Sequence, residues 1–405
     1  MRFFLLSVDI VLAISTLQFA AYLALLTLAA MFSRHRPTFA VSPSQRRFAI
    51  LVPAHDEEAV IGKTLKYLLA LEYPQSQFDI IVIADNCSDS TASIARSARV
   101  NVFERIDSVN TGKGHALRWC LDRLSEQGKI FDAFVFIDAD TLASPNLLSV
   151  MDAHLQRGAD CIQCSDLVAS QPGAWSPEVT RIAFLLHNFV RPLGKMAFGL
   201  SASLNGSGMC LSKELIAAMP WTSYSRVEDL EYALELALRG VRVDFAPEAT
   251  IYTAMPSESK AAESQRRRWE IARFAVVKRY VRPLFLAAVR KRSVMILDMF
   301  FELVTPALVN LCLFTCAMIV IHTMLVVLGV DWLAGMGWIF ASALVLEGFH
   351  VLGGLFVARA TGADYGILVN IPRYAFWKLL LYFRTILHGD DKAWIRTQRS
   401  NRYAA

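Results

Sequence analysis

Long apolar segments near both ends of the chain limit what it can fold into. Residues Phe3 to Phe32 contain one charged side chain, and further apolar runs cover Val294–Val330 and Trp338–Val357. At about 1.5 Å of rise per residue, a helix of roughly 20 apolar residues crosses the ~30 Å hydrocarbon core of a bilayer. The sequence therefore predicts one transmembrane helix in residues 1–33 and two in residues 294–359.

The charges beside these runs predict their orientation. Basic residues follow the first run, and the short stretch 331–337 between the other two contains no Lys or Arg. Cytoplasmic segments carry the excess of Lys and Arg. We therefore expect an external N-terminus, a cytoplasmic middle and a cytoplasmic C-terminus in a multi-pass protein of the cell (inner) membrane. The first run is too long for the apolar region of a cleaved signal peptide, which is the alternative interpretation.

Three amphipathic segments are expected at the bilayer surface. Between Arg266 and Arg292 the chain has ten Lys or Arg residues and one acid. This run directly precedes an apolar stretch, which favours anionic lipid over nucleic acid as its partner. We expect a basic interfacial helix at 276–293, and a second at Tyr365–His388 within a segment 363–405 that ends in a cytoplasmic tail; a fourth span is the alternative there. The third is Pro177–Leu200, for which core packing is the alternative.

Two ionisable residues interrupt the last apolar run. Glu347 and His350 lie one helical turn apart in it. Because a buried ionisable group is costly in a bilayer, such residues indicate either a polar lining or packing between helices.

The middle of the chain, residues 47–275, has the pattern of a water-soluble domain. Short β-rich runs alternate with helical ones, which is typical of a βα-wound, mostly parallel sheet of the α/β class. The expected strands are Phe48–Pro53, Phe78–Ala84, Asn101–Arg105, Ala133–Ile137, Asp160–Leu167 and Arg242–Phe245. The expected helices include Ala59–Leu71, Gly112–Gln127 and Asp229–Arg239.

Acidic residues follow three of these strands. Glu57, Asp85 and the pair Asp138 and Asp140 stand just after strand ends, and ligands bind at the carboxyl ends of such strands. For the single acids Glu57 and Asp89, helix capping is an equally good explanation. The pair 138/140 is different, because two adjacent carboxylates repel unless a cation joins them. A divalent metal with a diphosphate fits this pair.

The chain resembles the membrane-integrated, inverting glycosyltransferases of family 2, which have the GT-A fold. The resemblance covers roughly residues 47–275 and depends on an ordered set of motifs. These are Pro53-Ala54-His55-Asp56-Glu57-Glu58, Asp85, Lys113 in Gly112-Lys113-Gly114-His115-Ala116-Leu117, Asp138-Ala139-Asp140, Glu228-Asp229 and Gln265-Arg266-Arg267-Arg268-Trp269. Cellulose, chitin, hyaluronan and poly-N-acetylglucosamine synthases are members of this group.

The resemblance implies a role for each motif. Asp229 would be the catalytic base, with Glu228 as the next candidate, and Trp269 would stack on the acceptor sugar. A Mg²⁺ or Mn²⁺ ion would bind Asp140 and Asp138. The nucleotide-sugar site would be formed by Pro53, His55, Glu57, Asp85, Lys113, Asp138, Gln265 and Arg268. The chain departs from the family pattern at Val227, where threonine is frequent, and at 205–208, which only approximates the acceptor-side loop of processive members.

The implied function is transfer of a sugar, most simply from a UDP-sugar, to a growing polysaccharide with β-linkages and export across the membrane. The alternative is transfer of one sugar to a lipid acceptor, which three spans would accommodate more easily than a polymer channel. From another class, a non-catalytic nucleotide-sugar-binding subunit is disfavoured, because the acids, Gln, Arg and Trp are all present.

The orientation can be tested by labelling single cysteines. A cysteine introduced at Gly337 should react with a membrane-impermeant maleimide on intact cells, whereas one at Ala404 should react only after lysis. The reverse labelling pattern would contradict the three-span topology.

Overall fold

The computed structural model describes residues 2–33, 46–171, 173, 175–253, 259–330 and 334–378, with the backbone alone for residues 2, 259–272 and 334. Within these residues the chain divides into two compact units. The sheet unit comprises residues 46–177 and 200–300. The helical unit comprises residues up to 33, 178–199 and 301–378. Each unit is considered by itself.

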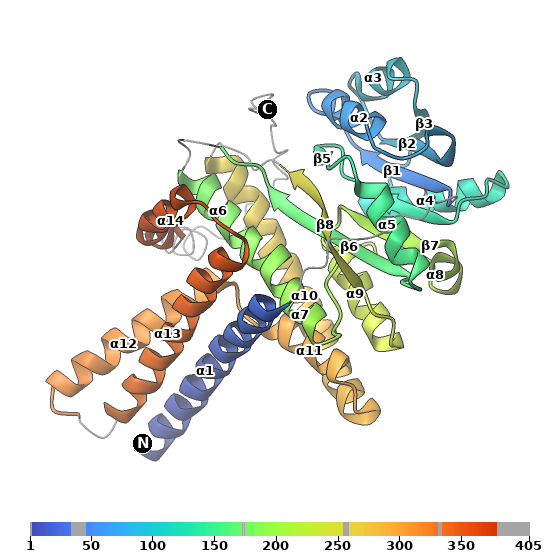
Figure 1. The fold of residues 1–405 in the computed structure, drawn as a ribbon. Helices are drawn as coiled ribbons and strands as arrows, with labels where there is room; N and C mark the ends of the chain where they lie inside the picture. The colour runs from blue at the N-terminus through green and yellow to red at the C-terminus, as the bar shows by residue number, and fades with distance from the viewer. Residues whose placement is uncertain are drawn as a thin grey trace. The chain divides into compact units, whose positions relative to one another are not determined.

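The sheet unit is built on one mixed sheet of eight strands. The strands are β1 (Phe48–Ala54), β2 (Phe78–Asp85), β3 (Asn101–Arg105), β4 (Ala133–Phe136), β5 (Thr141–Ala143), β6 (Cys161–Val168), β7 (Met209–Ser212) and β8 (Asp244–Thr253). Their order is β3-β2-β1-β4-β7-β6-β8-β5 (Figure 1). The pairs β3–β2, β2–β1, β1–β4 and β6–β8 are parallel, whereas β7 and β5 pair antiparallel with their neighbours.

Five predicted strands agree with the structure to within one residue at each end. The sixth, predicted at Arg242–Phe245, is observed as Asp244–Thr253, and the sheet is more mixed than expected. The two strands that sequence reasoning missed, β5 and β7, have three and four residues. Runs this short show no clear alternation, so periodicity cannot detect them. Because β7 enters the middle of the sheet in the antiparallel sense, the parallel arrangement is interrupted between β4 and β6.

The sheet unit also contains helices, several of which contribute to its core. They are α2 (Ile61–Leu69), α3 (Thr91–Ser97), α4 (Lys113–Glu126), α5 (Leu147–Gln156), α8 (Lys213–Ala218), α9 (Glu228–Arg239) and α10 (Ser259–Lys291), with the short 3₁₀ turn Gln75–Gln77 before β2. The three predicted helices are confirmed to within two residues at each end. Ile50 and Val52 of β1 are fully buried in one cluster with Ile61 and Leu65 of α2, and burial of such side chains provides the main driving force for folding.

The helical unit consists of α1 (Arg2–Phe32), the last turns of α6 (Trp175–Leu185), a π-helical turn (Leu186–Val190), α7 (Arg191–Ala197), the end of α11 (Val294–Val304), α12 (Leu308–Val327), α13 (Ala334–Val357) and α14 (Gly362–Ile367). Among the described residues, three helices are long and apolar enough to cross a membrane. They are Phe3–Phe32, Leu308–Val327 and Gly335–Val357.

Polar contacts join these three helices in pairs. Asp9 of α1 lies 3.0 Å from Nε2 of His322 on α12. Thr315 of α12 donates a 2.7 Å hydrogen bond to Glu347 of α13, and Oγ1 of Thr27 lies 2.6 Å from Nδ1 of His350. Glu347 and His350 therefore serve packing between helices, one of the two interpretations that the sequence allowed.

Three predicted segments can be compared with the described structure. The run Val294–Val330 is not one helix, because it breaks before Pro306, whose ring is incompatible with a helix interior. Pro177–Leu200 packs against α1 within the helical unit: a Cβ on Gly194 would lie 2.1 Å from the carbonyl oxygen of Leu26. Of Tyr365–His388, the structure describes α14, a 3₁₀ turn at Leu368–Asn370 and helical residues 371–378; residues from 379 lie outside the described part.

A buried histidine couples the stability of the sheet unit to pH. Nδ1 and Nε2 of His154 each lie 3.6 Å from a carboxylate oxygen, of Asp244 and Glu248 respectively. Burial alone would lower the pKa of His154, but the two carboxylates outweigh it and raise the pKa. A raised pKa stabilises the fold below the unfolded value of about 6.5, and this stabilisation is lost as pH rises through the folded value.

The thermal transition of the sheet unit should therefore fall between pH 6 and pH 8.5 in part because His154 loses its proton. His154→Gln should reduce this difference, as followed by circular dichroism in detergent. His115→Gln, which changes a histidine on α4, should leave the pH dependence as in the wild type. An unchanged pH dependence in His154→Gln would show that other groups cause it.

Candidate active site

The site is formed where adjacent parallel strands end. Ala54 of β1 is in register with Ala84 of β2, and the amide of Ile137, just after β4, donates to the carbonyl of Leu51 in β1 at 3.0 Å. The residues that follow these strands therefore meet at one edge of the sheet. Nδ1 of His55 lies 2.7 Å from the carbonyl oxygen of Asp85. Pro53 is half-buried within β1.

Asp85 is held by a buried arginine. Nη1 of Arg105, at the end of β3, donates to its Oδ1 at 2.7 Å. Nη2 of Arg105 binds Asp107 at 2.8 Å and the carbonyl of Asn110 at 2.7 Å. Asn86 adds a 3.1 Å bond to the same carboxylate oxygen of Asp85. Both charged side chains are almost fully buried, so the position of the Asp85 carboxylate is fixed.

Lys113, the first residue of α4, lies among the predicted catalytic acids. Its ammonium donates to Oδ1 of Asp138 at 2.6 Å and to the carbonyl of Gly206 at 2.7 Å. Oε1 of Glu228 lies 3.8 Å away. These acids raise the pKa of Lys113 despite its burial, which acts in the opposite sense. One cation thus connects the end of β4, the loop before β7 and the start of α9.

Gly206 allows the loop to approach these charges. Its φ is +80°, and a Cβ there would lie 3.1 Å from Oδ2 of Asp229 and 3.2 Å from Nζ of Lys113. An L-residue is disfavoured at this φ, and a side chain would displace the two charged groups. Asp229 and Lys113 are therefore close neighbours across Gly206.

The loop is held by buried hydrogen bonds. Gln163 of β6 accepts from the amide of Asn205 at 3.0 Å and donates to the carbonyl of Ser207 at 2.8 Å. The hydroxyl of Ser207 accepts from the amide of Asp138 at 3.0 Å. The loop and the turn that carries Asp138 and Asp140 are thus fixed to each other.

The turn 138–140 is braced from the other side as well. Thr64 of α2 donates to the carbonyl of Ala139 at 2.7 Å, and the amide of Thr141 donates to the carbonyl of Asp138 at 3.1 Å. Asp140 is buried. Burial raises the pKa of Asp166 on β6 well above its ordinary value, and the charges of Asp138, Asp140 and Asp229 act on it in the same direction.

The acidic pair at the start of α9 is protonated more easily than ordinary carboxylates. Burial raises the pKa of Glu228 to about 7, with Lys113 opposing and Asp229 adding to the shift. Burial also raises the pKa of Asp229, again against the effect of Lys113. A carboxylate shifted toward neutrality in this way is suited to accept a proton at physiological pH.

The composition of the site fits a divalent cation. Asp138, Glu228 and Asp229 lie around Lys113, and Asp140 and Asp166 add negative charge close to Asp138 and Asp229. Carboxylate oxygens are the ligands that Mg²⁺ and Mn²⁺ prefer. A metal held by Asp138 and Asp140 would balance this negative charge and, when bound, would stabilise the charge that develops on a diphosphate.

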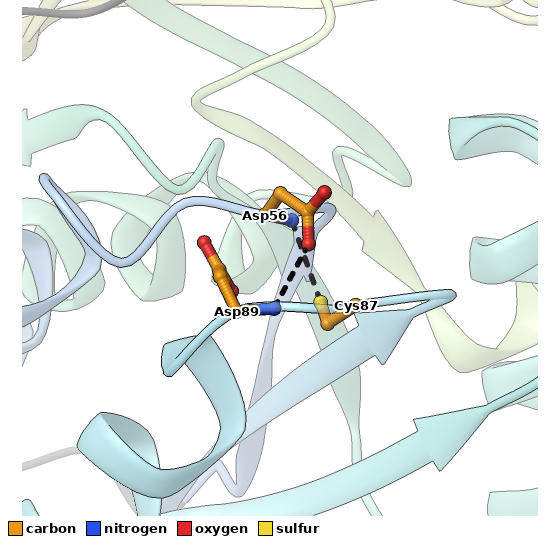
Figure 2. A group of neighbouring side chains, drawn as sticks. All are labelled: Asp56, Cys87 and Asp89. Carbon is orange, nitrogen blue, oxygen red and sulfur yellow. Dashed lines mark hydrogen bonds between the residues drawn. The ribbon is translucent and has the colours of Figure 1, made fainter.

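A second acidic group at the strand ends has a structural role. Asp56, Cys87 and Asp89 are the one trio in the described residues whose ligand atoms all lie within 4.8 Å of one another (Figure 2). Asp56 accepts from the amides of Ser88 at 2.6 Å and Asp89 at 3.3 Å. Asp89 accepts from the amides of Thr91 at 2.9 Å and Glu58 at 3.1 Å. These bonds join the turns after β1 and β2.

The remaining predicted residues lie near these turns or on α10. The amide of Glu57 donates to Thr91 at 2.7 Å, which holds the turn after β1 against α3. Gln265, Arg268 and Trp269 belong to α10. Their side chains are outside the described part of the structure. The structure thus brings Lys113, Asp138, Glu228 and Asp229 together, with His55 and Asp85 at the neighbouring strand ends.

Sequence reasoning missed Arg105, Gln163 and Asp166. For Asp166 a signal was available, because a carboxylate inside an otherwise apolar strand is uncommon and points to a special environment. Arg105 ends a predicted strand, and nothing local distinguishes it from an exposed arginine. Gln163 acts on a loop 42 residues away.

The mixed sheet has acids at its strand ends and a lysine at the start of a helix beside them, and comparisons with known proteins show the family. The model for glycosyltransferase like family 2 matches residues 45–272, more than half of the chain. The protein therefore belongs to glycosyltransferase family 2 and is a transferase. The mannosyltransferase PcManGT from Pyrobaculum calidifontis has the same fold, with a TM-score of 0.52 at 17% identity over 83% of this chain and 97% of that one.

Sequence relatives extend the comparison. A probable glycosyltransferase, YdaM of Bacillus subtilis, is 26% identical over 88% of both chains. A beta-monoglucosyldiacylglycerol synthase of Trichormus variabilis is 28% identical over 55% of this chain and 47% of its own length. A poly-beta-1,6-N-acetyl-D-glucosamine synthase of Staphylococcus aureus is 23% identical over 54% of this chain and 52% of its own length. The last two matches span about half of each relative.

Replacement of Lys113 should change the pH dependence of activity. Lys113→Met removes the charge that opposes the raised pKa of Asp229, so the acidic limb of the pH–rate profile should move upward by roughly one unit or more. Lys113→Arg, which keeps the charge, should move it less. Lys66→Met on the exposed side of α2 is the control for charge. An acidic limb that stays in place in Lys113→Met would contradict this electrostatic role.

Proposed function

We propose that the protein transfers a sugar with inversion from a nucleoside diphosphate donor, most simply a UDP-sugar, to a hydroxyl of a lipid acceptor. The observation that carries this proposal is the cluster of Asp229, Lys113 and Asp138 around Gly206. It combines a carboxylate able to accept a proton with acids that suit a metal-bound diphosphate.

In this proposal the oxygen of the acceptor hydroxyl attacks the anomeric carbon of the donor sugar. Asp229 accepts the proton that this hydroxyl loses. The bond from that carbon to the diphosphate oxygen breaks, and the nucleoside diphosphate leaves with the electron pair. A single displacement inverts the centre, so an α-linked donor yields a β-linked product. Mg²⁺ or Mn²⁺ on Asp138 and Asp140 would offset the charge of the leaving group. Gln265 and Arg268 would hold the diphosphate, and Asp85, fixed by Arg105, would contact the nucleoside.

Packing in the helical unit supports a lipid acceptor. In its described part, Asp9, Thr27, Glu347 and His350 contact polar groups of neighbouring helices. Such contacts suit a packed bundle, whereas a polymer channel needs polar groups that face a lumen. The similarity to beta-monoglucosyldiacylglycerol synthases supports the same choice. Polysaccharide synthesis with export is the second candidate, supported by the similarity to the poly-beta-1,6-N-acetyl-D-glucosamine synthase.

The domain organisation in this proposal follows the sequence. Residues 47–275 act in the cytoplasm, 1–33 and 294–359 anchor them in the inner membrane, and 276–293 lies on the membrane surface. One side of α10 supports this last assignment, because Phe274 and Phe285 are exposed at 75% and 47% on a helix that also exposes Lys278 and Arg282. Exposed aromatic and basic side chains on one face are typical of interfacial helices.

The function can be tested with the purified full chain in vesicles that contain diacylglycerol. We expect a β-linked glycolipid, formed from one member of a panel of UDP-glucose, UDP-galactose, UDP-N-acetylglucosamine and GDP-mannose. Transfer should stop in excess EDTA and return with Mn²⁺ or Mg²⁺. Asp229→Asn keeps the size of the side chain but cannot accept the proton, so transfer should fall on the order of 10²-fold or more while UDP still binds.

The products distinguish the candidates. A water-soluble polymer in place of a glycolipid would favour the polysaccharide synthase. An α-linked product would contradict single displacement. Near-normal transfer by Asp229→Asn would exclude Asp229 as the base and make Glu228 the next residue to test. Full activity in EDTA would exclude the metal.

A further inference from the structure

Helix α10 is tied to helix α9 by a partly buried cluster of polar groups, in which Arg279 is exposed. The hydroxyl of Tyr280 lies 3.2 Å from Oε1 of Glu231 and 2.9 Å from Oε1 of Glu235. Nη1 of Arg279 donates to Oε1 of Glu231 at 2.5 Å. Tyr280 and Glu231 are buried. Buried hydrogen bonds to charged groups are among the stronger ones in proteins, so this cluster holds the two helices at one relative position.

Apolar packing supports the same contact. Every fourth residue along this part of α10 is buried, namely Val276, Tyr280, Leu284 and Ala288. Residues four apart lie on one face of a helix. The rotation of α10 about its own axis is therefore set, with this face inward and Phe274 outward.

A second tie shows that the two helices run in the same direction. Lys291, at the end of α10, donates to the carbonyl of Leu238 near the end of α9 at 2.7 Å. Tyr280 therefore contacts Glu231 early in α9, and Lys291, later in α10, contacts Leu238, later in α9. The part of α10 before Tyr280 therefore extends past the start of α9.

The start of α9 carries Asp229, and the earlier part of α10 carries Gln265, Arg268 and Trp269. At about 1.5 Å per residue, Trp269 precedes Tyr280 by ~16 Å along the helix axis, whereas Asp229 precedes Glu231 by ~3 Å. A small rotation or slide at the tie would thus be transmitted along α10 to these three residues while Asp229 stays in place.

We propose that Tyr280 and Arg279 are positioning residues for the transfer reaction: by binding Glu231 and Glu235 they fix the N-terminal half of α10 relative to Asp229. The proposal rests on the proposed function, since it assumes that α10 holds the donor diphosphate and the acceptor. The four residues of the tie contact one another and act through α10, so none of them needs to touch the substrate.

Two tyrosine variants test the tie. Tyr280→Phe removes the hydroxyl that binds both glutamates and keeps the ring. Tyr232→Phe is the matched control, because Tyr232 is also buried, lies on α9 and donates a 2.7 Å hydrogen bond, but to the carbonyl of Met219. Both variants lose the hydroxyl of a buried tyrosine and keep its ring, so a loss of stability alone should affect them similarly.

We expect Tyr280→Phe to weaken UDP binding by about 10-fold, as measured by calorimetry, and Tyr232→Phe to change it less than twofold. Backbone amide exchange in residues 259–272 should become faster in Tyr280→Phe, relative to peptides of β1 and β2 in the same sample. Glu235→Gln keeps an acceptor for the hydroxyl and should preserve most of the UDP affinity.

Equal behaviour of the two tyrosine variants, in UDP affinity and in exchange, would overturn the proposal. If Tyr280→Phe does not fold, Arg279→Gln is tested in its place. This variant should also weaken UDP binding and speed up exchange in residues 259–272, but by less. Wild-type UDP affinity and exchange in Arg279→Gln would then overturn the proposal. Exchange is measured without substrate. A wild-type chain that transfers no sugar from any nucleotide donor would therefore contradict the proposed function, whereas an unchanged exchange pattern contradicts the positioning role.

Discussion

The candidate site depends on one interaction, the insertion of the Lys113 ammonium among carboxylates from separate parts of the chain. Asp138 follows β4, Glu228 and Asp229 begin α9, and the carbonyl of Gly206 belongs to the loop before β7. Without this cation the three acids would repel one another, and each would gain a proton more readily. The lysine therefore allows the acids to stand together in the arrangement that a metal-bound diphosphate and an attacking hydroxyl require.

Helix α9 links this charge cluster to the rest of the sheet unit. Its first residues carry the proposed base, its next turns bind Arg279 and Tyr280 of α10, and its last turn accepts from Lys291. A helix is stiff over this length, so Asp229 and the residues that bind α10 keep fixed positions relative to each other. On the other side of the site, Arg105 holds Asp85, and Gln163 holds the loop with Gly206. Asp85 and the loop with Gly206 are thus each held by a buried neighbour.

The helical unit uses the same principle in an apolar setting. Its three candidate spans are joined by the pairs Asp9–His322, Thr315–Glu347 and Thr27–His350, one between each two helices. A polar group without a partner is expensive in a bilayer, so each pair fixes one helix contact. Gly194 lets α7 approach α1 closely. This packing is the physical basis for favouring a lipid acceptor over a polymer lumen.

The sequence alone determined the features that depend on local pattern. The length of the apolar runs predicted the candidate spans. The succession of β-rich and helical runs predicted six strands and three helices. The order of the motifs predicted family 2 and the candidate residues Asp85, Lys113, Asp138 and Asp229. Only the tertiary structure decided the mixed sheet, the contact of Lys113 with a carbonyl 93 residues away, the contact of Arg105 with Asp85, the burial of Asp166, and the tie between α9 and α10. The reason is physical: a local pattern reports the period and the burial of an element, whereas the partner of a buried charge is set by how distant elements pack.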